Sequence, residues 1–129
     1  MDLVNIIKQK QYAFIYAPAS REQIYRAEKD LDVIFSEEYT NYISEFGVAI
    51  FDSHELTGIC DGKRLDVVSI TKEQRKYNSF VPNDLYVVEC LDIDGIVIWQ
   101  NTKGEIYQSI PNGKMMKISN NIAEYINET

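Results

Sequence analysis

The first half of the chain places its apolar residues at the helical spacing of about 3.6 residues. This pattern predicts a short helix over residues 3–10, a second over 20–31 and a third over 36–46. The second helix begins with the sequence of a capping box, and Ser36 is a suitable N-terminal cap for the third. Gly47 follows the last turn of the third helix, where glycine commonly ends helices.

Beyond residue 47 the apolar spacing changes to about two, which is the period of β-strands. Six segments show strand character: 48–51, 55–59, 84–91, 95–101, 105–110 and 114–118. Residues 64–70 indicate either a strand or an apolar lead into a short helix over 71–77, which Thr71 would cap. A last helix, capped by Ser119, is expected to close the chain.

The stretch 90–108 contains acids that could open a calcium loop or support hairpin turns. A calcium loop of the EF-hand type needs oxygen ligands at alternating positions, but β-branched apolar residues occupy those positions after Asp94. Glycine after Asp94 and after Lys103 instead favours two tight turns. The sequence therefore predicts one α+β domain over residues 1–129. N-terminal helices pack on a mainly antiparallel sheet, the second half forms a meander, and a C-terminal helix closes the chain.

Charge narrows the choice of partners. The 129 residues carry a net charge of −7, so nucleic acid and anionic lipid repel the chain and basic proteins are the expected partners. Residues 30–62 contain eight acids and neither lysine nor arginine, whereas residues 63–76 have a net charge of +3. The acidic block is either a solvated surface or a surface that contacts a partner, and both interpretations remain open.

The expected compartment is the cytoplasm. Cys60 and Cys90 have no metal-type spacing and lie in apolar or strand-like contexts, which is typical of reduced, partly buried thiols. The N-terminus lacks the pattern of a signal peptide, and the apolar runs are too short to span a membrane.

No catalytic, metal or cofactor motif stands out. A nucleophile would have to use His54, the only histidine, and no nucleophile-elbow pattern surrounds the candidates. We expect His54 to be a polar surface residue in a loop. Zinc needs more His and Cys in one place, the glycines form no phosphate loop, and no pair of carboxylates is singled out, although the composition permits one. The prediction is a non-enzymatic protein without metal or cofactor, in which Trp99 packs in the core.

Several segments stand in an order that is more specific than any of them alone. They are ASREQIYRAEKDL with Ile24 and Glu28, FSEEYTNYISEFG with Tyr39 and Gly47, ELTGI with Gly58, then LDVVSITKEQRKY, DIDG and NTKGEIYQ. From residue 20 onward this ordered set resembles the SUKH superfamily, which includes a fungal cell-wall-synthesis regulator and many bacterial immunity proteins. Ser36 stands where the family usually has proline, and serine also caps helices well.

The resemblance implies binding rather than catalysis, because the family offers no catalytic residues to transfer. It implies an immunity protein that neutralises a cognate secreted toxin, such as a nuclease, or alternatively a regulatory scaffold without a toxin. Tyr39, Gly47 and Gly58 would be structural. Glu28 would be buried and paired with a backbone amide of the sheet or with Arg75.

Nucleases present basic surfaces to phosphate, so an acidic protein is suited to cover them. We expect acids on loops and strand ends to dominate the surface that meets the toxin. These acids are Asp52, Glu55, Asp61, Asp92 and Asp94. No oligomeric state follows from the sequence.

Overall fold

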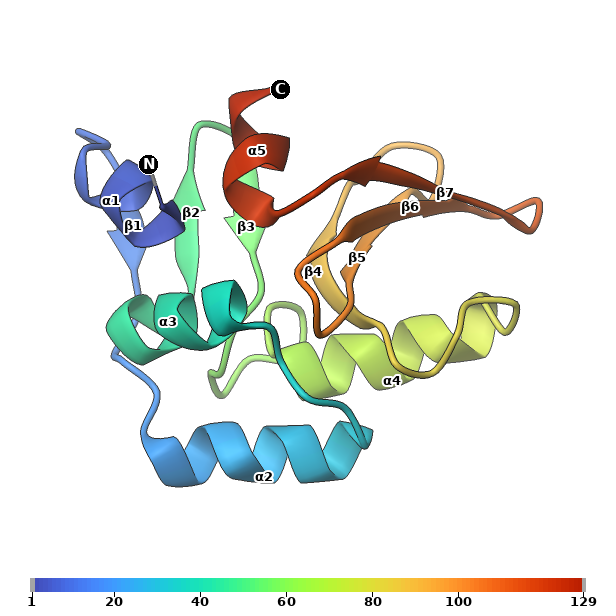
Figure 1. The fold of residues 1–129 in the computed structure, drawn as a ribbon, viewed down its shortest axis with the longest axis horizontal. Helices are drawn as coiled ribbons and strands as arrows, with labels where there is room; N and C mark the ends of the chain where they lie inside the picture. The colour runs from blue at the N-terminus through green and yellow to red at the C-terminus, as the bar shows by residue number, and fades with distance from the viewer. Residues whose placement is uncertain (1, 129) are drawn as a thin grey trace.

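The chain folds around two antiparallel sheets (Figure 1). The computed structural model describes residues 2–128. The elements in chain order are α1 (Leu3–Lys8), β1 (Phe14–Ile15), α2 (Arg21–Leu31), α3 (Glu37–Phe46), β2 (Ala49–Phe51), β3 (His54–Leu56), α4 (Val67–Tyr77), β4 (Tyr86–Cys90), β5 (Val97–Gln100), β6 (Ile106–Ile110), β7 (Lys114–Ser119) and α5 (Ile122–Asn127). Strands β1 to β3 form one sheet and β4 to β7 form a meander. The predicted α+β class, meander and closing helix are confirmed.

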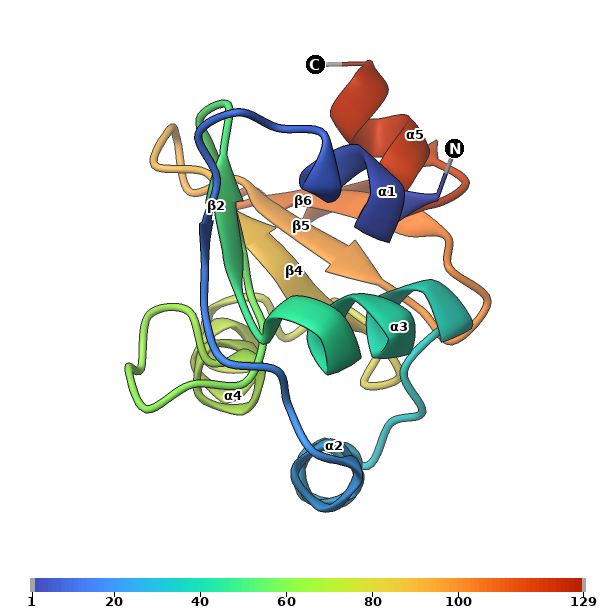
Figure 2. The same cartoon turned by 90° about the vertical axis from the view of Figure 1, so that its left-hand side faces the viewer.

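Strands β4 and β5 of the four-stranded sheet are buried on both faces, because their alternate side chains enter two apolar clusters, whereas most of β7 is exposed or half-buried. Trp99 and Val97 pack with Ile70 of α4 on one face. Ile98 and Ile106 enter the larger cluster, which includes residues of α1, α3 and α5. Figure 2 shows α4 on one side of this sheet and α1, α3 and α5 on the other. The sheet is thus the central layer of the fold.

Strand β1 was not predicted. The segment YAFIYAPAS alternates poorly between apolar and polar residues, and Pro18 breaks any helix there, so no element was expected. In the structure Phe14 pairs with Ile50, and the Tyr16 N–H donates to the carbonyl of Val48 at 3.0 Å. Tertiary pairing with β2 therefore creates a strand of two residues, and β1 forms the edge of the three-stranded sheet.

Two of the predicted helix caps are confirmed. The Ser20 side chain accepts from the Gln23 amide at 3.1 Å, while the Gln23 side chain accepts from the Ser20 amide at 2.8 Å, which completes the capping box of α2. Ser36 accepts from the Tyr39 amide at 3.0 Å and caps α3.

Two other predicted caps are wrong. Helix α4 begins four residues before Thr71, and its cap is Asp66, whose carboxylate accepts from the Ser69 amide at 3.2 Å. Thr71 is buried inside the helix, where its hydroxyl accepts from the Val87 amide at 3.0 Å. Helix α5 is capped by Asn121, and the expected cap, Ser119, ends β7 instead.

Candidate partner-binding face

The five acids expected to contact a partner lie on segments that face one side of the molecule. Asp52 is in the turn between β2 and β3, Glu55 is in β3, and Asp61 is in the loop between β3 and α4. Asp92 and Asp94 are in the turn between β4 and β5. Figure 2 shows these turns and the loop on its left-hand side, beside β1 and β2. We call this side the acidic face.

Glu55 is paired within the acidic face. Its two carboxylate oxygens accept from the two terminal nitrogens of Arg64, each at 2.8 Å. These hydrogen bonds hold the pKa of Glu55 below its ordinary value, and Glu55 in turn raises the pKa of Arg64. Asp92 and Tyr16 also raise the Arg64 pKa to a smaller extent. Arg64 therefore interacts with Glu55 of β3 and with Asp92 of the turn between β4 and β5, and it offsets part of their charge.

Asp52 is also paired, because Lys10 Nζ lies 2.6 Å from its carboxylate. Asp61, Asp92 and Asp94 are exposed, and within residues 2–128 none of the three forms an ion pair. The five acids are thus not equivalent. The unpaired charge of the acidic face belongs to Asp61, Asp92 and Asp94.

An aromatic stripe borders the acidic face, and the sequence analysis missed it. Tyr12, Phe14 and Tyr16 are 81%, 73% and 43% exposed. Phe14 stands opposite Ile50, and Ile50 stands opposite Glu55, so these side chains share one face of the three-stranded sheet. The signal was present as aromatics at every second position of YAFIY. Exposed aromatic side chains are typical of protein-binding surfaces.

The stripe and the acids also share a hollow. Tyr16 and Pro18 line it from one side, and Cys60, Asp61 and Gly62 line it from the other. The hollow is shallow and open to solvent, so it suits a protruding side chain of a protein partner better than an enclosed small ligand.

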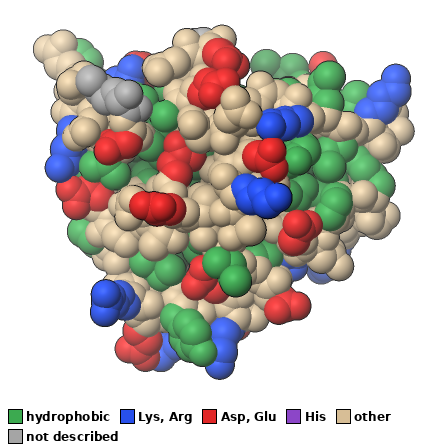
Figure 3. All heavy atoms as spheres, in the orientation of Figure 1, with side chains coloured by type: hydrophobic (Ala, Val, Ile, Leu, Met, Phe, Trp, Pro, Cys, Tyr) green, Lys and Arg blue, Asp and Glu red, His purple; other side chains and the backbone are tan. Residues whose placement is uncertain are grey.

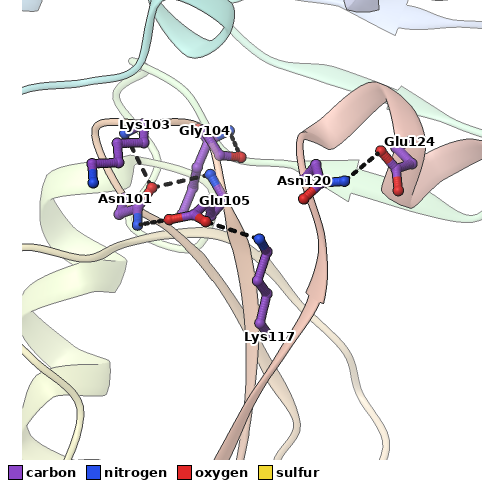
Figure 4. Close-up of polar contacts among 8 residues, drawn as sticks. Asn101, Lys103, Gly104, Glu105, Lys117, Asn120 and Glu124 are labelled. Carbon is purple, nitrogen blue, oxygen red and sulfur yellow. Dashed lines mark hydrogen bonds and ion pairs between the residues drawn. The ribbon is translucent and has the colours of Figure 1, made fainter.

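The face shown in Figure 3 is different, because acidic and basic side chains alternate on it. Figure 4 shows one such group in the turn between β5 and β6. Glu105 accepts from Lys117 at 2.8 Å and from the Asn101 side-chain amide at 3.0 Å, and both contacts lower the Glu105 pKa. The Asn101 side-chain oxygen accepts from the amides of Lys103 and Glu105. These bonds close the predicted turn at Lys103 and Gly104, so the group is scaffold.

The predicted turn at Asp94 and Gly95 is confirmed as well. Both residues have positive φ, at 55° and 69°, as the two central residues of a type I′ turn require. Asp92 and Asp94 are therefore held on a short hairpin turn and project into solvent.

The expectation for His54 is wrong. His54 lies in β3 and is 8% exposed, and its Nδ1 is 3.1 Å from the carboxylate of Glu89, which is 1% exposed. The Tyr125 hydroxyl donates to Glu89 at 2.6 Å, and the Glu55 amide donates to it at 2.7 Å. Burial, and then the Glu89 charge, raise the Tyr125 pKa. The donors come from β3 and α5 and surround a carboxylate of β4, so this cluster joins three elements beneath the acidic face.

Glu38 forms a second junction. Its carboxylate accepts from the amides of Ile122 and Ala123 at 2.7 and 2.9 Å, and from the Gln100 side chain at 2.9 Å. Gln100 also accepts from the Tyr86 hydroxyl at 2.8 Å. Glu38 of α3 therefore anchors the first turn of α5 to the four-stranded sheet.

Glu28 has a different partner from either one expected. It is half-buried, and its carboxylate accepts from the amide of Phe35 at 2.8 Å, in the link between α2 and α3. Arg75 instead donates to the carbonyls of Leu31 and Asn83, at 3.1 and 2.7 Å. Glu28 thus satisfies a backbone amide in the link between α2 and α3, and Arg75 satisfies carbonyls at the end of α2 and in the loop before β4.

The two glycines expected to be structural lie against each other. Gly47 has a φ of 69°, and a Cβ there would meet the carbonyl oxygen of Ala17. A Cβ at Gly58 would meet the carbonyl oxygen of Gly47. That carbonyl accepts from the Ile59 amide at 3.1 Å. Two backbone segments approach so closely here that neither position has room for a side chain.

Tyr39 and Trp99 are fully buried. The Tyr39 hydroxyl is 2.8 Å from the Thr57 hydroxyl, and burial raises the Tyr39 pKa. Trp99 donates its indole N–H to the Ser109 hydroxyl at 2.9 Å. Cys60 and Cys90 are half-buried free thiols.

Among residues 2–128 no group of three His, Cys, Asp or Glu side chains is arranged to hold a metal ion. None of the described helices has both the length and the apolar character needed to cross a membrane.

Comparison with known families agrees with the order of the segments. The family model SUKH_5, described as SMI1-KNR4 cell-wall, matches residues 1–129. The chain belongs to this family. The match confirms the SUKH resemblance and extends it to the residues before position 20. No curated protein matches this SUKH chain. SUKH members are commonly immunity proteins and generally non-enzymatic, which directs attention to surfaces rather than to the buried acid and histidine.

Proposed function

We propose that this SUKH protein is a cytoplasmic immunity protein that binds and neutralises a cognate toxin with a basic surface, such as a nuclease. The supporting observation is the acidic face, where three unpaired carboxylates stand beside exposed aromatic side chains. Family membership supports a protein-binding role, and the charge supports a basic partner.

The physical argument separates two contributions. Asp61, Asp92 and Asp94 are exposed, so they accelerate encounter with a basic protein and give binding its salt dependence. Tyr16 lies next to Asp61 in the hollow and contributes contact area once the two proteins have met. Glu55 and Asp52 contribute less, because each must first lose its partner in Arg64 or Lys10.

The alternative is a regulatory scaffold without a toxin. A gene for a toxin with a variable C-terminal domain directly upstream would favour immunity, whereas several housekeeping partners would favour the scaffold. The first experiment is therefore a pull-down from the native cell, with bound proteins identified by mass spectrometry and challenged with rising salt. One basic toxin domain that salt releases supports the proposal.

The captured toxin then allows a charge-matched test. The test variant, Asp61→Asn with Asp92→Asn, removes two charges from the acidic face. The control variant, Asp30→Asn with Asp84→Asn, also removes two exposed charges, one at the C-terminal end of α2 and one in the loop before β4. The first pair should slow association about three- to tenfold at low salt and flatten its salt dependence. The control pair should leave both nearly unchanged. Equal effects of the two pairs would exclude a role for this face.

A further inference from the structure

Strand β1 forms an unpaired edge of the three-stranded sheet that carries exposed apolar side chains. Tyr12, Phe14, Ile15 and Tyr16 are all at least 43% exposed, and β1 pairs with β2 on one side only. Natural sheets usually protect such edges with charges, proline or a covering element. Figure 2 looks onto this edge and shows no helix in front of β1. A run of apolar residues on an open edge therefore needs a physical reason.

The register shows which backbone groups are available at the edge. The Tyr16 N–H donates toward β2, to the Val48 carbonyl at 3.0 Å. Because successive residues of a strand direct their N–H and C=O to opposite sides, Phe14 also faces β2, while Ala13 and Ile15 face the open edge. A new strand would have to bond to Ala13 and Ile15.

We propose that two copies of this protein associate through β1, in antiparallel fashion, about a two-fold axis at Phe14. In this register Ala13 and Ile15 of one copy exchange hydrogen bonds with Ile15 and Ala13 of the other, which is the pairing that the free backbone groups permit. Phe14 meets Phe14 of the second copy, and Tyr12 meets Tyr16. The sequence YAFIY is thus self-complementary, as an interface across a two-fold axis must be.

The pairs formed are favourable ones. Phe14 would face Phe14 of the second copy as an aromatic cross-strand pair, and Tyr12, in the turn before β1, and Tyr16, directly after β1, would flank it. The charged residues near β1 do not oppose pairing of the two strands. Lys10 is the only charged residue between residues 9 and 20, and it is paired with Asp52 in its own copy. No like charges would therefore stand opposite each other in the paired strands.

The surface area that two copies can bury at β1 limits the affinity of the dimer. With about 200 Å² for an aromatic side chain, the exposed parts of Tyr12, Phe14 and Tyr16 supply roughly 400 Å² per copy. Ile15 and the backbone bring the pair to about 1,000 Å², near the lower bound for a specific interface. We therefore expect a weak dimer with a micromolar Kd, which joins two three-stranded sheets into one of six strands.

The oligomeric state of the full chain tests the proposal by sedimentation equilibrium between about 5 and 500 µM. The wild type should shift from monomer to dimer in this range. Phe14→Arg places two like charges at the axis and should weaken association more than tenfold. Tyr77→Arg is the control, because Tyr77 is also 73% exposed but lies in α4, and it should dimerise like the wild type. Circular dichroism checks that both variants fold.

Three outcomes would overturn the proposal: a wild type that stays monomeric at 500 µM, a dimer that survives Phe14→Arg, or equal loss in both variants. A monomeric wild type would leave the edge to a strand from another protein. Tyr16 belongs to both proposed contacts, so a dimer would compete with the toxin for this side chain, whereas a monomeric wild type leaves Tyr16 available and the proposed function intact.

Disulfide formation tests the register. In a background with Cys60→Ala and Cys90→Ala, Phe14→Cys should cross-link two copies, because facing residues at the axis have Cα atoms about 4.5 Å apart. Tyr12→Cys should not, since its two copies would be separated by about 13 Å along the strands. Cross-linking at Phe14→Cys alone supports the axis, and equal cross-linking at both positions contradicts it.

Discussion

Replacing Glu38 with glutamine should weaken the attachment of α5 to the sheet with little change in side-chain shape. The Glu38 carboxylate accepts three hydrogen bonds, from the Ile122 and Ala123 amides and from Gln100. A glutamine keeps the shape but has one acceptor oxygen, so its NH₂ group would face a donor. The remaining bonds would also lose the strength that the negative charge gives them.

The expected cost follows from these contacts. One donor left without an acceptor costs about 1–3 kcal/mol, and a bond to a neutral group is worth about 1 kcal/mol less than a bond to a charged one. Glu38→Gln should therefore lower the free energy of unfolding by about 2–3 kcal/mol. Glu37→Gln is the matched control. Glu37 is the neighbouring exposed acid in the first turn of α3, where loss of its interaction with the helix dipole costs about 0.5 kcal/mol.

Urea denaturation of both variants measures the difference, which should be about 2 kcal/mol, with a Tm difference of roughly 6–10 °C. Hydrogen exchange adds a local readout, since the amides of Ile122 and Ala123 should exchange faster in Glu38→Gln alone. If the two variants agree within about 0.5 kcal/mol, the anchoring role of Glu38 is refuted.

Three further predictions follow from other contacts. Gly58→Ala should destabilise the fold by more than about 3 kcal/mol in thermal unfolding, because its Cβ overlaps a backbone oxygen, whereas Gly62→Ala, with no atom within 4 Å of the added Cβ, should be nearly neutral. The Glu55 carboxylate should titrate below its ordinary pKa by NMR and return toward it in Arg64→Gln. Its contribution to stability is present above the unfolded pKa and is lost as pH falls through the folded pKa. Cys90, whose pKa burial raises to about 11, should react with iodoacetamide at pH 8 more slowly than a free cysteine.

The sequence correctly predicted features that depend on residues close together in the chain. The caps at Ser20 and Ser36 were predictable because each bonds to an amide three residues away. Helix α4 shows where prediction from local sequence fails. The β-branched pair Val67 and Val68 favours a strand by propensity, but Val67, Ile70 and Thr71 pack on one buried helical face, so tertiary contacts override the propensity.

The roles of individual acids depended on partners distant in sequence. Glu37 and Glu38 look alike as first-turn acids, yet only Glu38 reaches amides 84 and 85 positions further along the chain. His54 looked like a loop residue because its partner, Glu89, is 35 positions away. For the acidic face, the sequence identified the acids but not which of them Lys10 and Arg64 neutralise.

The two proposed interactions have opposite responses to salt, which separates them in one series of measurements. Binding of a basic toxin relies on Asp61, Asp92 and Asp94, so rising salt should weaken it as charges are screened. Association through β1 relies on uncharged strands, while each copy carries a net charge of −7. Screening removes the repulsion between copies, so the same rise in salt should leave the dimer unchanged or strengthen it. A dimer that dissociates as salt rises would place charged groups in the contact, and the axis at Phe14 would then be wrong.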